Sequence, residues 1–208
     1  MGSIDLLSEG PADAAVTIAL AHGAGGPMDS PFMVAFSAGL AGRGYRVVRF
    51  EFPYMAGRRE NGIKRPPDRP PVLFESWKNI IGHLGTDGLV IGGKSFGGRI
   101  ASMIADETGV LGLVCLGYPF HAPGREADAR RLDHMTEIKT PTLIVQGERD
   151  ALGNADEVAG YPLSPAVHVH WMPDGDHSFK PRKKSGHTED GNWQAGIDAV
   201  AGFVIGLR

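Results

Sequence analysis

A serine near the middle of the chain has the neighbours that a nucleophilic serine requires. The stretch Gly93-Lys94-Ser95-Phe96-Gly97 fits the pattern Gly-x-Ser-x-Gly, in which a serine occupies a sharp turn between a strand and a helix. Such a turn strains the serine backbone, and small residues two positions before and after it relieve contacts with neighbouring elements. An apolar run precedes Ser95 and a helical pattern follows it. The stretch therefore predicts a nucleophile elbow with Ser95 at its tip.

The same stretch also matches a phosphate-binding loop, because Gly88 to Ser95 has the spacing Gly, four residues, Gly-Lys-Ser. In a phosphate loop the four intervening residues leave the strand and turn their N–H groups toward phosphate oxygens. Here they are Leu89 to Gly92, which are typical of a strand. The next strand candidate ends in Gly117-Tyr118 rather than in an aspartate that could hold Mg²⁺. The pattern therefore favours the elbow over nucleotide binding.

A nucleophilic serine needs a base that removes its proton and an acid that orients the base, and these follow it in chain order. Asp150 comes just after an apolar run, at the carboxyl edge of a predicted strand, where ligands of open α/β sheets bind. His177 lies in the loop after the following strand candidate. We predict Asp150 as the acid and His177 as the base. The alternative acids are Glu148, Asp174 and Asp176.

A glycine-rich loop after the first strong strand candidate is suited to stabilise an oxyanion. It reads His22-Gly23-Ala24-Gly25-Gly26, and preorganised backbone N–H groups are the usual donors to the oxyanion of acyl transfer. We predict the N–H groups of Ala24 and Phe96 as these donors, with Gly25 as the near alternative. His22 is predicted to brace the loop by hydrogen bonds rather than to act as a second base.

The elements that must position these residues alternate between short apolar runs and amphipathic stretches, a pattern typical of parallel β-α units. The strand candidates are Ala15 to Ala21, Arg46 to Phe50, Leu89 to Gly92, Leu111 to Leu116, Thr142 to Gln146 and Val167 to Trp171. The helix candidates are Pro31 to Ala41, Val72 to Leu84, Phe96 to Glu107 and Asn192 to Leu207. Most of the strand candidates are apolar throughout, which indicates helices on both faces of the sheet. We expect a single α/β domain over residues 1–208, built as a three-layer α/β/α sandwich with a mostly parallel sheet and no large lid domain.

Aromatic residues that follow two strand candidates are predicted to line an apolar acyl pocket together with Gly25. They are Tyr54, after Phe52-Pro53, and Tyr118 and Phe120, after the strand candidate that ends at Leu116. The alternative for these aromatic residues is ordinary packing in the core.

Two basic runs have no role in this scheme. The first, Gly57 to Pro71, is predicted to be an extended exposed loop because prolines this dense interrupt regular structure. The second is Lys180 to Lys184. Each run either binds a carboxylate or phosphate of the substrate or is simply a solvated charged surface. The charge of Lys94, beside the nucleophile, also has no role that the pattern reveals.

Composition excludes several other classes of protein. Lys plus Arg at 21 and Asp plus Glu at 24 give a net charge of −3, which argues against nucleic acid as a main partner. The single cysteine, Cys115, cannot form an internal disulfide or a four-cysteine zinc site, and its strand position predicts a buried, inert thiol. No 18-residue apolar run and no signal-peptide pattern occur, so we expect no membrane span and a cytoplasmic location.

A metal site near the end of the chain is the remaining alternative. His168 and His170 share one face of a strand candidate close to Asp174, Asp176 and His177. Because His168 would lie well behind the loop, we do not predict a metal there. The scheme also needs no organic cofactor.

The motifs, taken in order along the chain, resemble those of the α/β-hydrolase superfamily, in its compact dienelactone-hydrolase-like branch. More narrowly, His22 to Gly26, Gly93 to Gly98 and Asp174 to Lys184 look like the predicted hydrolases related to testis-expressed protein 30 and to a subunit of a histone-acetylating complex. The resemblance implies a serine hydrolase that cleaves small soluble carboxylic esters or thioesters through an acyl-enzyme. Its nucleophile, acid and base would be Ser95, Asp150 and His177. The alternative is a catalytically silent module of the same fold that binds or scaffolds partners.

Overall fold

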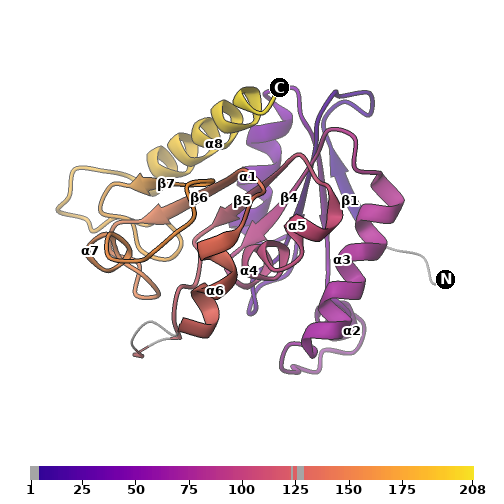
Figure 1. Ribbon diagram of the computed structural model, residues 1–208, viewed down its shortest axis with the longest axis horizontal. Coiled ribbons are helices and arrows are strands. Elements are labelled where there is room, and N and C mark those ends of the chain that lie inside the picture. The colour runs from indigo at the N-terminus through magenta and orange to yellow at the C-terminus, as the bar shows by residue number, and fades with distance from the viewer. Residues whose placement is uncertain (1–4, 123, 126–128) are drawn as a thin grey trace.

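A twisted, mostly parallel sheet forms the centre of the computed structural model, which describes residues 5–122, 124–125 and 129–208 (Figure 1). Within these residues seven strands pair in the order β1-β3-β2-β4-β5-β6-β7. Only β1 runs antiparallel, on β3 at one edge, and each of the other described pairs is parallel. The strands are β1 (Leu6–Glu9), β2 (Thr17–Ala21), β3 (Arg46–Phe50), β4 (Leu89–Lys94), β5 (Gly112–Leu116), β6 (Thr142–Gly147) and β7 (Val167–Met172).

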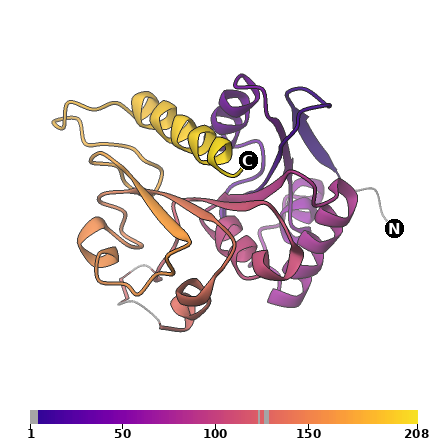
Figure 2. The same ribbon diagram turned by 45° about the horizontal axis from the view of Figure 1, so that its top comes forward.

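Helices cover both faces of the sheet, as the sequence predicts. One face carries α1 (Pro31–Ala41) and α8 (Glu189–Gly206), which lie side by side (Figures 1 and 2). The helices that contribute to the core on the other face are α2 (Pro53–Asn61), α3 (Pro70–Leu84), α4 (Phe96–Ser102), α5 (Ala105–Thr108), α6 (Ala129–Glu137) and α7 (Ala155–Val158). The three-layer α/β/α sandwich is therefore confirmed.

The inner strands contribute side chains to two separate hydrophobic cores, one on each face of the sheet. Val90 of β4 is buried against α1 and α8, whereas its neighbour Ile91 is buried in the core on the opposite face. This alternation explains why inner strands read as unbroken apolar runs, because each face is covered by helices. The edge strand β7 is different. Its histidines His168 and His170 are exposed and only its last residue, Met172, is buried.

The prediction from the sequence omitted several short elements and was wrong about one helix and one loop. The missed elements are β1, α2, α6 and α7. The predicted helix from Phe96 to Glu107 is wrong as a single element, because it breaks into α4 and α5. The predicted loop over Gly57 to Pro71 is also wrong at both ends, since α2 extends to Asn61 and α3 begins at Pro70. Proline at a helix N-terminus starts the helix rather than interrupting it, because the N–H it lacks would have no acceptor there.

Glycines allow the turn from β4 into α4 to pack directly on backbone. A Cβ on Gly97 would lie 2.5 Å from the carbonyl oxygens of both Ala21 and His22. A Cβ on Gly93 would also run into the backbone of Ala21. The expectation that the residues two positions before and two positions after Ser95 must be small is thus confirmed. Their small size lets the end of β4 pack against the loop that follows β2.

None of the helices in the described parts of the chain combines the length and the apolarity needed to cross a bilayer.

We predict opposite effects on stability from two glycine-to-alanine substitutions. Gly97→Ala should lower the free energy of unfolding by about 2 kcal/mol, because its methyl group overpacks against backbone that cannot move freely. Gly82→Ala, at an exposed position inside α3 with open space around it, should raise it by about 0.5–1 kcal/mol through helix propensity. Denaturant unfolding of both variants and the wild type measures the difference. Equal stability of the two variants would contradict the packing of α4 on β2.

Candidate active site

Ser95 occupies a strained turn at the carboxyl edge of the sheet. Its backbone has φ 51° and ψ −114°, a region that residues other than glycine rarely adopt. The Ser95 N–H donates to the carbonyl oxygen of Leu116 at 2.9 Å, which continues the ladder between β4 and β5 by one residue. The chain then enters α4 at Phe96. A strained turn from strand to helix therefore carries Ser95 at its tip.

Three side chains from distant parts of the sequence form a continuous hydrogen-bonded chain. His177 Nε2 lies 2.8 Å from Ser95 Oγ, and His177 Nδ1 lies 2.7 Å from Asp150 Oδ2. With the imidazole proton on Nδ1, His177 donates to Asp150 and its Nε2 accepts from the serine hydroxyl. The structure thus brings together all three residues that the sequence predicts as nucleophile, base and acid. This geometry suits removal of a proton from serine by histidine.

Asp150 is fully buried, and other donors satisfy the rest of its carboxylate. The Leu152 N–H donates to Oδ1 at 2.8 Å and the Gln146 side-chain amide donates to Oδ2 at 2.9 Å. Buried carboxylates need such donors, because they lose their hydration on folding. Gln146 was missed by sequence reasoning. The signal that could have found it is a polar residue at the end of the otherwise apolar run of β6.

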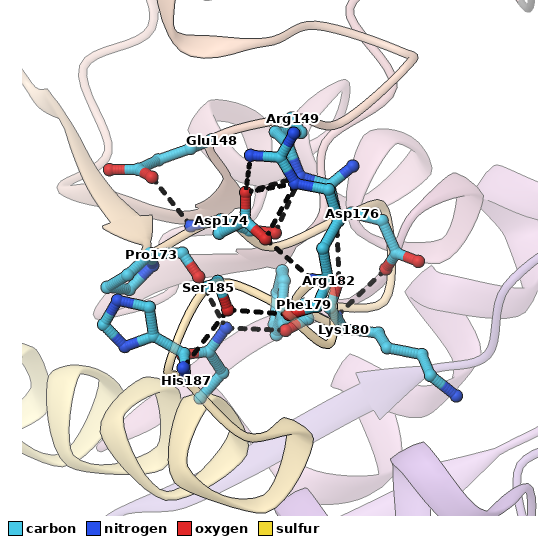
Figure 3. A network of polar contacts seen from close by, with 11 residues as sticks. Glu148, Arg149, Pro173, Asp174, Asp176, Phe179, Lys180, Arg182, Ser185 and His187 are labelled. Carbon is cyan, nitrogen blue, oxygen red and sulfur yellow. Dashed lines mark hydrogen bonds and ion pairs between the residues drawn. The ribbon is translucent and has the colours of Figure 1, made fainter.

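The alternative acids hold the loop that carries His177, here called the base loop (residues 173–182). Asp174 forms ion pairs with Arg149 and Arg182, and its N–H donates to Glu148 Oε2 at 2.7 Å (Figure 3). The ion pair with Arg182 lowers the pKa of Asp174 to about 2. Asp176 accepts through Oδ1 from two backbone N–H groups farther along the loop. These carboxylates are engaged away from the His177 imidazole, which leaves Asp150 as its partner.

Helix α8 anchors the base loop from the other side. Asn192 donates through Nδ2 to the carbonyl oxygens of Pro173 and Phe179, at 3.0 and 2.7 Å. The indole N–H of Trp193 donates to the Ser178 carbonyl at 3.0 Å. The loop is therefore tied at several points on either side of His177.

A hollow of about 370 Å³ lies beside Ser95 and His177. Glycine-loop residues form one side of it, and Ala24 and Gly25 are among them. Phe96 does not line the hollow, but it follows Ser95 directly and, as the first residue of α4, its N–H has no acceptor within the helix. The other lining residues are Gly23, Gly26, Ser30, Pro31, Phe32, Lys94 and Ser178.

The aromatic residues predicted to line an acyl pocket lie elsewhere. Tyr118 and Phe120 are completely buried in the core between the sheet and its helices, where each packs against the other. Tyr54 is also buried, and its hydroxyl donates to the Ala24 carbonyl at 3.2 Å. None of the three lines the hollow at Ser95. This part of the prediction is corrected, because the chain turns inward after β3 and β5 and these rings fill the core.

His22 braces the glycine loop, as predicted. Its Nδ1 lies 2.7 Å from the Gly23 carbonyl oxygen, and its Nε2 accepts from the Phe52 N–H at 3.1 Å. Burial lowers the pKa of the imidazole and so favours the neutral form that this pair of bonds requires. Cys115 is a buried thiol within β5, also as predicted, and burial raises its pKa.

The basic runs are partly neutralised by neighbouring carboxylates. Arg59 pairs with both Asp29 and Glu51, and Lys180 pairs with Glu189. Among the described residues, no group of three or more His, Cys, Asp or Glu side chains has the arrangement of a metal site.

Comparison with known proteins agrees with this architecture. The family model described as an alpha/beta hydrolase domain matches residues 14–205. An α/β serine hydrolase homologue from Coxiella burnetii is 21% identical with a TM-score of 0.70, over 98% of this chain and 91% of that one. A protein from Xanthomonas campestris described as an α/β serine hydrolase without a lid is 20% identical with a TM-score of 0.65, over 95% and 89%. A monoacylglycerol lipase from Paleococcus ferrophilus is 12% identical with a TM-score of 0.73, over 100% of both chains.

These similarities confirm the α/β fold class that the sequence predicts. Because the family match covers nearly the whole sequence and the sheet has the corresponding architecture, the chain belongs to the alpha/beta hydrolase domain family.

Proposed function

We propose that this protein is a serine hydrolase that cleaves small carboxylic esters or thioesters. The observation that carries the proposal is the hydrogen-bonded chain from Ser95 through His177 to Asp150. An activated serine of this kind attacks acyl carbons, and the strained elbow presents its hydroxyl at the edge of an open hollow. The serine hydrolase and lipase names of proteins with the same fold support this reaction class.

The proposed reaction begins when Ser95 Oγ attacks the carbonyl carbon of the substrate and its proton passes to His177 Nε2. Asp150 stabilises the imidazolium that forms. The negative charge that develops on the carbonyl oxygen is received by the N–H groups of Ala24 and Phe96. The tetrahedral intermediate then collapses, and His177 returns the proton to the departing alcohol or thiol.

Water completes the cycle by attacking the acyl-enzyme. His177 takes a proton from this water, the carboxylic acid leaves, and the proton returns to Ser95 Oγ. Neither step requires a group beyond the protein and water.

The size and lining of the hollow favour a small acyl group. At about 370 Å³, with glycines along one side and Phe32 and Pro31 among its other residues, it suits a short or compact acid portion. The dienelactone-hydrolase-like branch and the relation to testis-expressed protein 30 are part of this proposal. A cytoplasmic location, expected from the sequence, stays a prediction.

Ser95→Ala should abolish turnover without unfolding the protein. We expect kcat for short-chain 4-nitrophenyl esters and acyl thioesters to fall by about 10⁴-fold or more, because the substitution removes the hydroxyl that forms the acyl-enzyme. Initial rates measured beside circular dichroism of both proteins test this. Turnover by the variant at the wild-type rate would contradict the assignment of the nucleophile.

Two carboxamide substitutions separate the proposed acid from its neighbour on the same turn. Asp150→Asn should lower kcat by about 10⁴-fold, because an amide neither holds the required tautomer of His177 nor stabilises its cation. Glu148→Gln should change kcat by less than about tenfold, since the new side chain still offers an oxygen to the Asp174 N–H. Steady-state kinetics on the same esters distinguish the two. A larger loss of kcat in Glu148→Gln than in Asp150→Asn would show that Asp150 is not the acid.

A wild-type protein that folds, hydrolyses none of these esters and retains a constant partner would instead favour the binding-module alternative.

A further inference from the structure

Lys94, the residue immediately before the proposed nucleophile, carries a cation into the interior. The residue is only 9% exposed, and its Nζ donates a hydrogen bond to the backbone carbonyl oxygen of His177. The ammonium lies 5.1 Å from the ring centroid of Phe32 and 5.7 Å from that of Phe179. Faces of aromatic rings attract cations, so the ammonium is held by one carbonyl and two rings.

Stabilisation of the fold does not explain why the Lys94 ammonium is buried. Burial lowers the pKa of Lys94 to about 8, which means that the fold disfavours the charged form even though Asp150 and Asp176 attract it. An apolar side chain of similar length would avoid the loss of hydration. A buried cation at this position therefore suggests a role in the site rather than in stability.

The turn after β5 leaves space for the hydrogen bond between Lys94 and His177. Gly117, just after β5, has φ +71°, and a Cβ there would lie 2.7 Å from Lys94 Nζ and 2.8 Å from the His177 carbonyl oxygen. Any side chain at residue 117 would therefore press into the hydrogen bond. The end of β4 thus supplies the donor, Lys94. The turn after β5 leaves the space in which this donor reaches the His177 carbonyl oxygen.

We propose that Lys94 is a positioning residue that fixes the backbone of His177 relative to Ser95. The inference rests on the proposed function. The imidazole of His177 bonds to Ser95 and Asp150, and the other bonds described for the base loop attach to residues on either side of His177. Lys94 instead attaches to the backbone of His177 itself. Since Lys94 and Ser95 are adjacent, the bond ties the imidazole to the same backbone that carries the hydroxyl.

The first test replaces the donor and keeps the length of the side chain. Lys94→Met should lower kcat by about 10- to 100-fold, the range expected when a catalytic group is slightly misplaced, with little change in KM. Reaction with a fluorophosphonate should slow by a similar factor, yet reach the same final stoichiometry as in the wild type. A lower final stoichiometry with an unchanged rate for the reactive fraction would indicate a purely structural role and would overturn the proposal.

A second variant breaks the same contact from the other side and has a matched control. Gly117→Ala should lower kcat to a similar extent, whereas Gly109→Ala, with φ +68° and open space around it, imposes the backbone strain alone and should leave kcat unchanged. The double variant Lys94→Met/Gly117→Ala should be no slower than the slower single variant, because both substitutions remove one interaction. Additive losses would overturn the proposal.

A readout without turnover keeps this inference separate from the proposed function. A strongly hydrogen-bonded imidazole Nδ1–H gives a far-downfield proton resonance, which we expect in the wild type and expect to weaken in Lys94→Met. If the wild type shows this resonance but neither hydrolyses esters nor reacts with the fluorophosphonate, the proposed function fails and the positioning role is still decided by the variant. An unchanged resonance in Lys94→Met, or none in the wild type, would overturn the positioning role.

Discussion

The hydrogen bond between His177 Nε2 and Ser95 Oγ joins segments 82 residues apart, and the rest of the site depends on holding its 2.8 Å length. Parallel strands make this possible, because the carboxyl ends of β4, β6 and β7 all reach the same edge of the sheet. Loops after these strands carry the serine, the aspartate and the histidine. The sheet therefore sets their approximate positions before any side chain interacts.

Close backbone contacts refine these positions. A Cβ on Gly147, at the end of β6, would lie 2.5 Å from the Gly175 carbonyl oxygen, so only glycine lets the turn of Asp150 rest on the base loop. Gly97 does the same for α4 and the strand that precedes the glycine loop. Close packing of this kind resists small displacements, and a shift of about 1 Å can cost a catalytic site a hundredfold in rate.

The site concentrates features that a protein built only for stability would avoid. Ser95 has a strained backbone, Asp150 is a fully buried carboxylate, and Lys94 is a nearly buried cation. The two buried charges are compensated locally by hydrogen bonds and aromatic rings. Strain and buried charge that persist because their surroundings compensate them are typical of functional sites.

Sequence patterns were informative where one local rule decides the structure. The inner strands were predicted within two residues because burial on both faces makes them apolar, and the elbow was predicted because its glycines are a steric necessity. The aromatic residues after β3 and β5 were wrongly assigned to an acyl pocket, since a pattern does not show whether a ring turns toward the hollow or the core. Likewise, Gln146 and Lys94 act through contacts with Asp150 and His177 that only the folded chain brings together.

The central claim is that Ser95 is a nucleophile activated by His177. Its most direct test is to treat the purified protein with a fluorophosphonate and map the modified residue by mass spectrometry of its peptides, beside His177→Ala. We expect one adduct per chain, on Ser95, that forms in the wild type and is lost in His177→Ala. A folded wild-type protein without an adduct, or with its adduct on another residue, would contradict it.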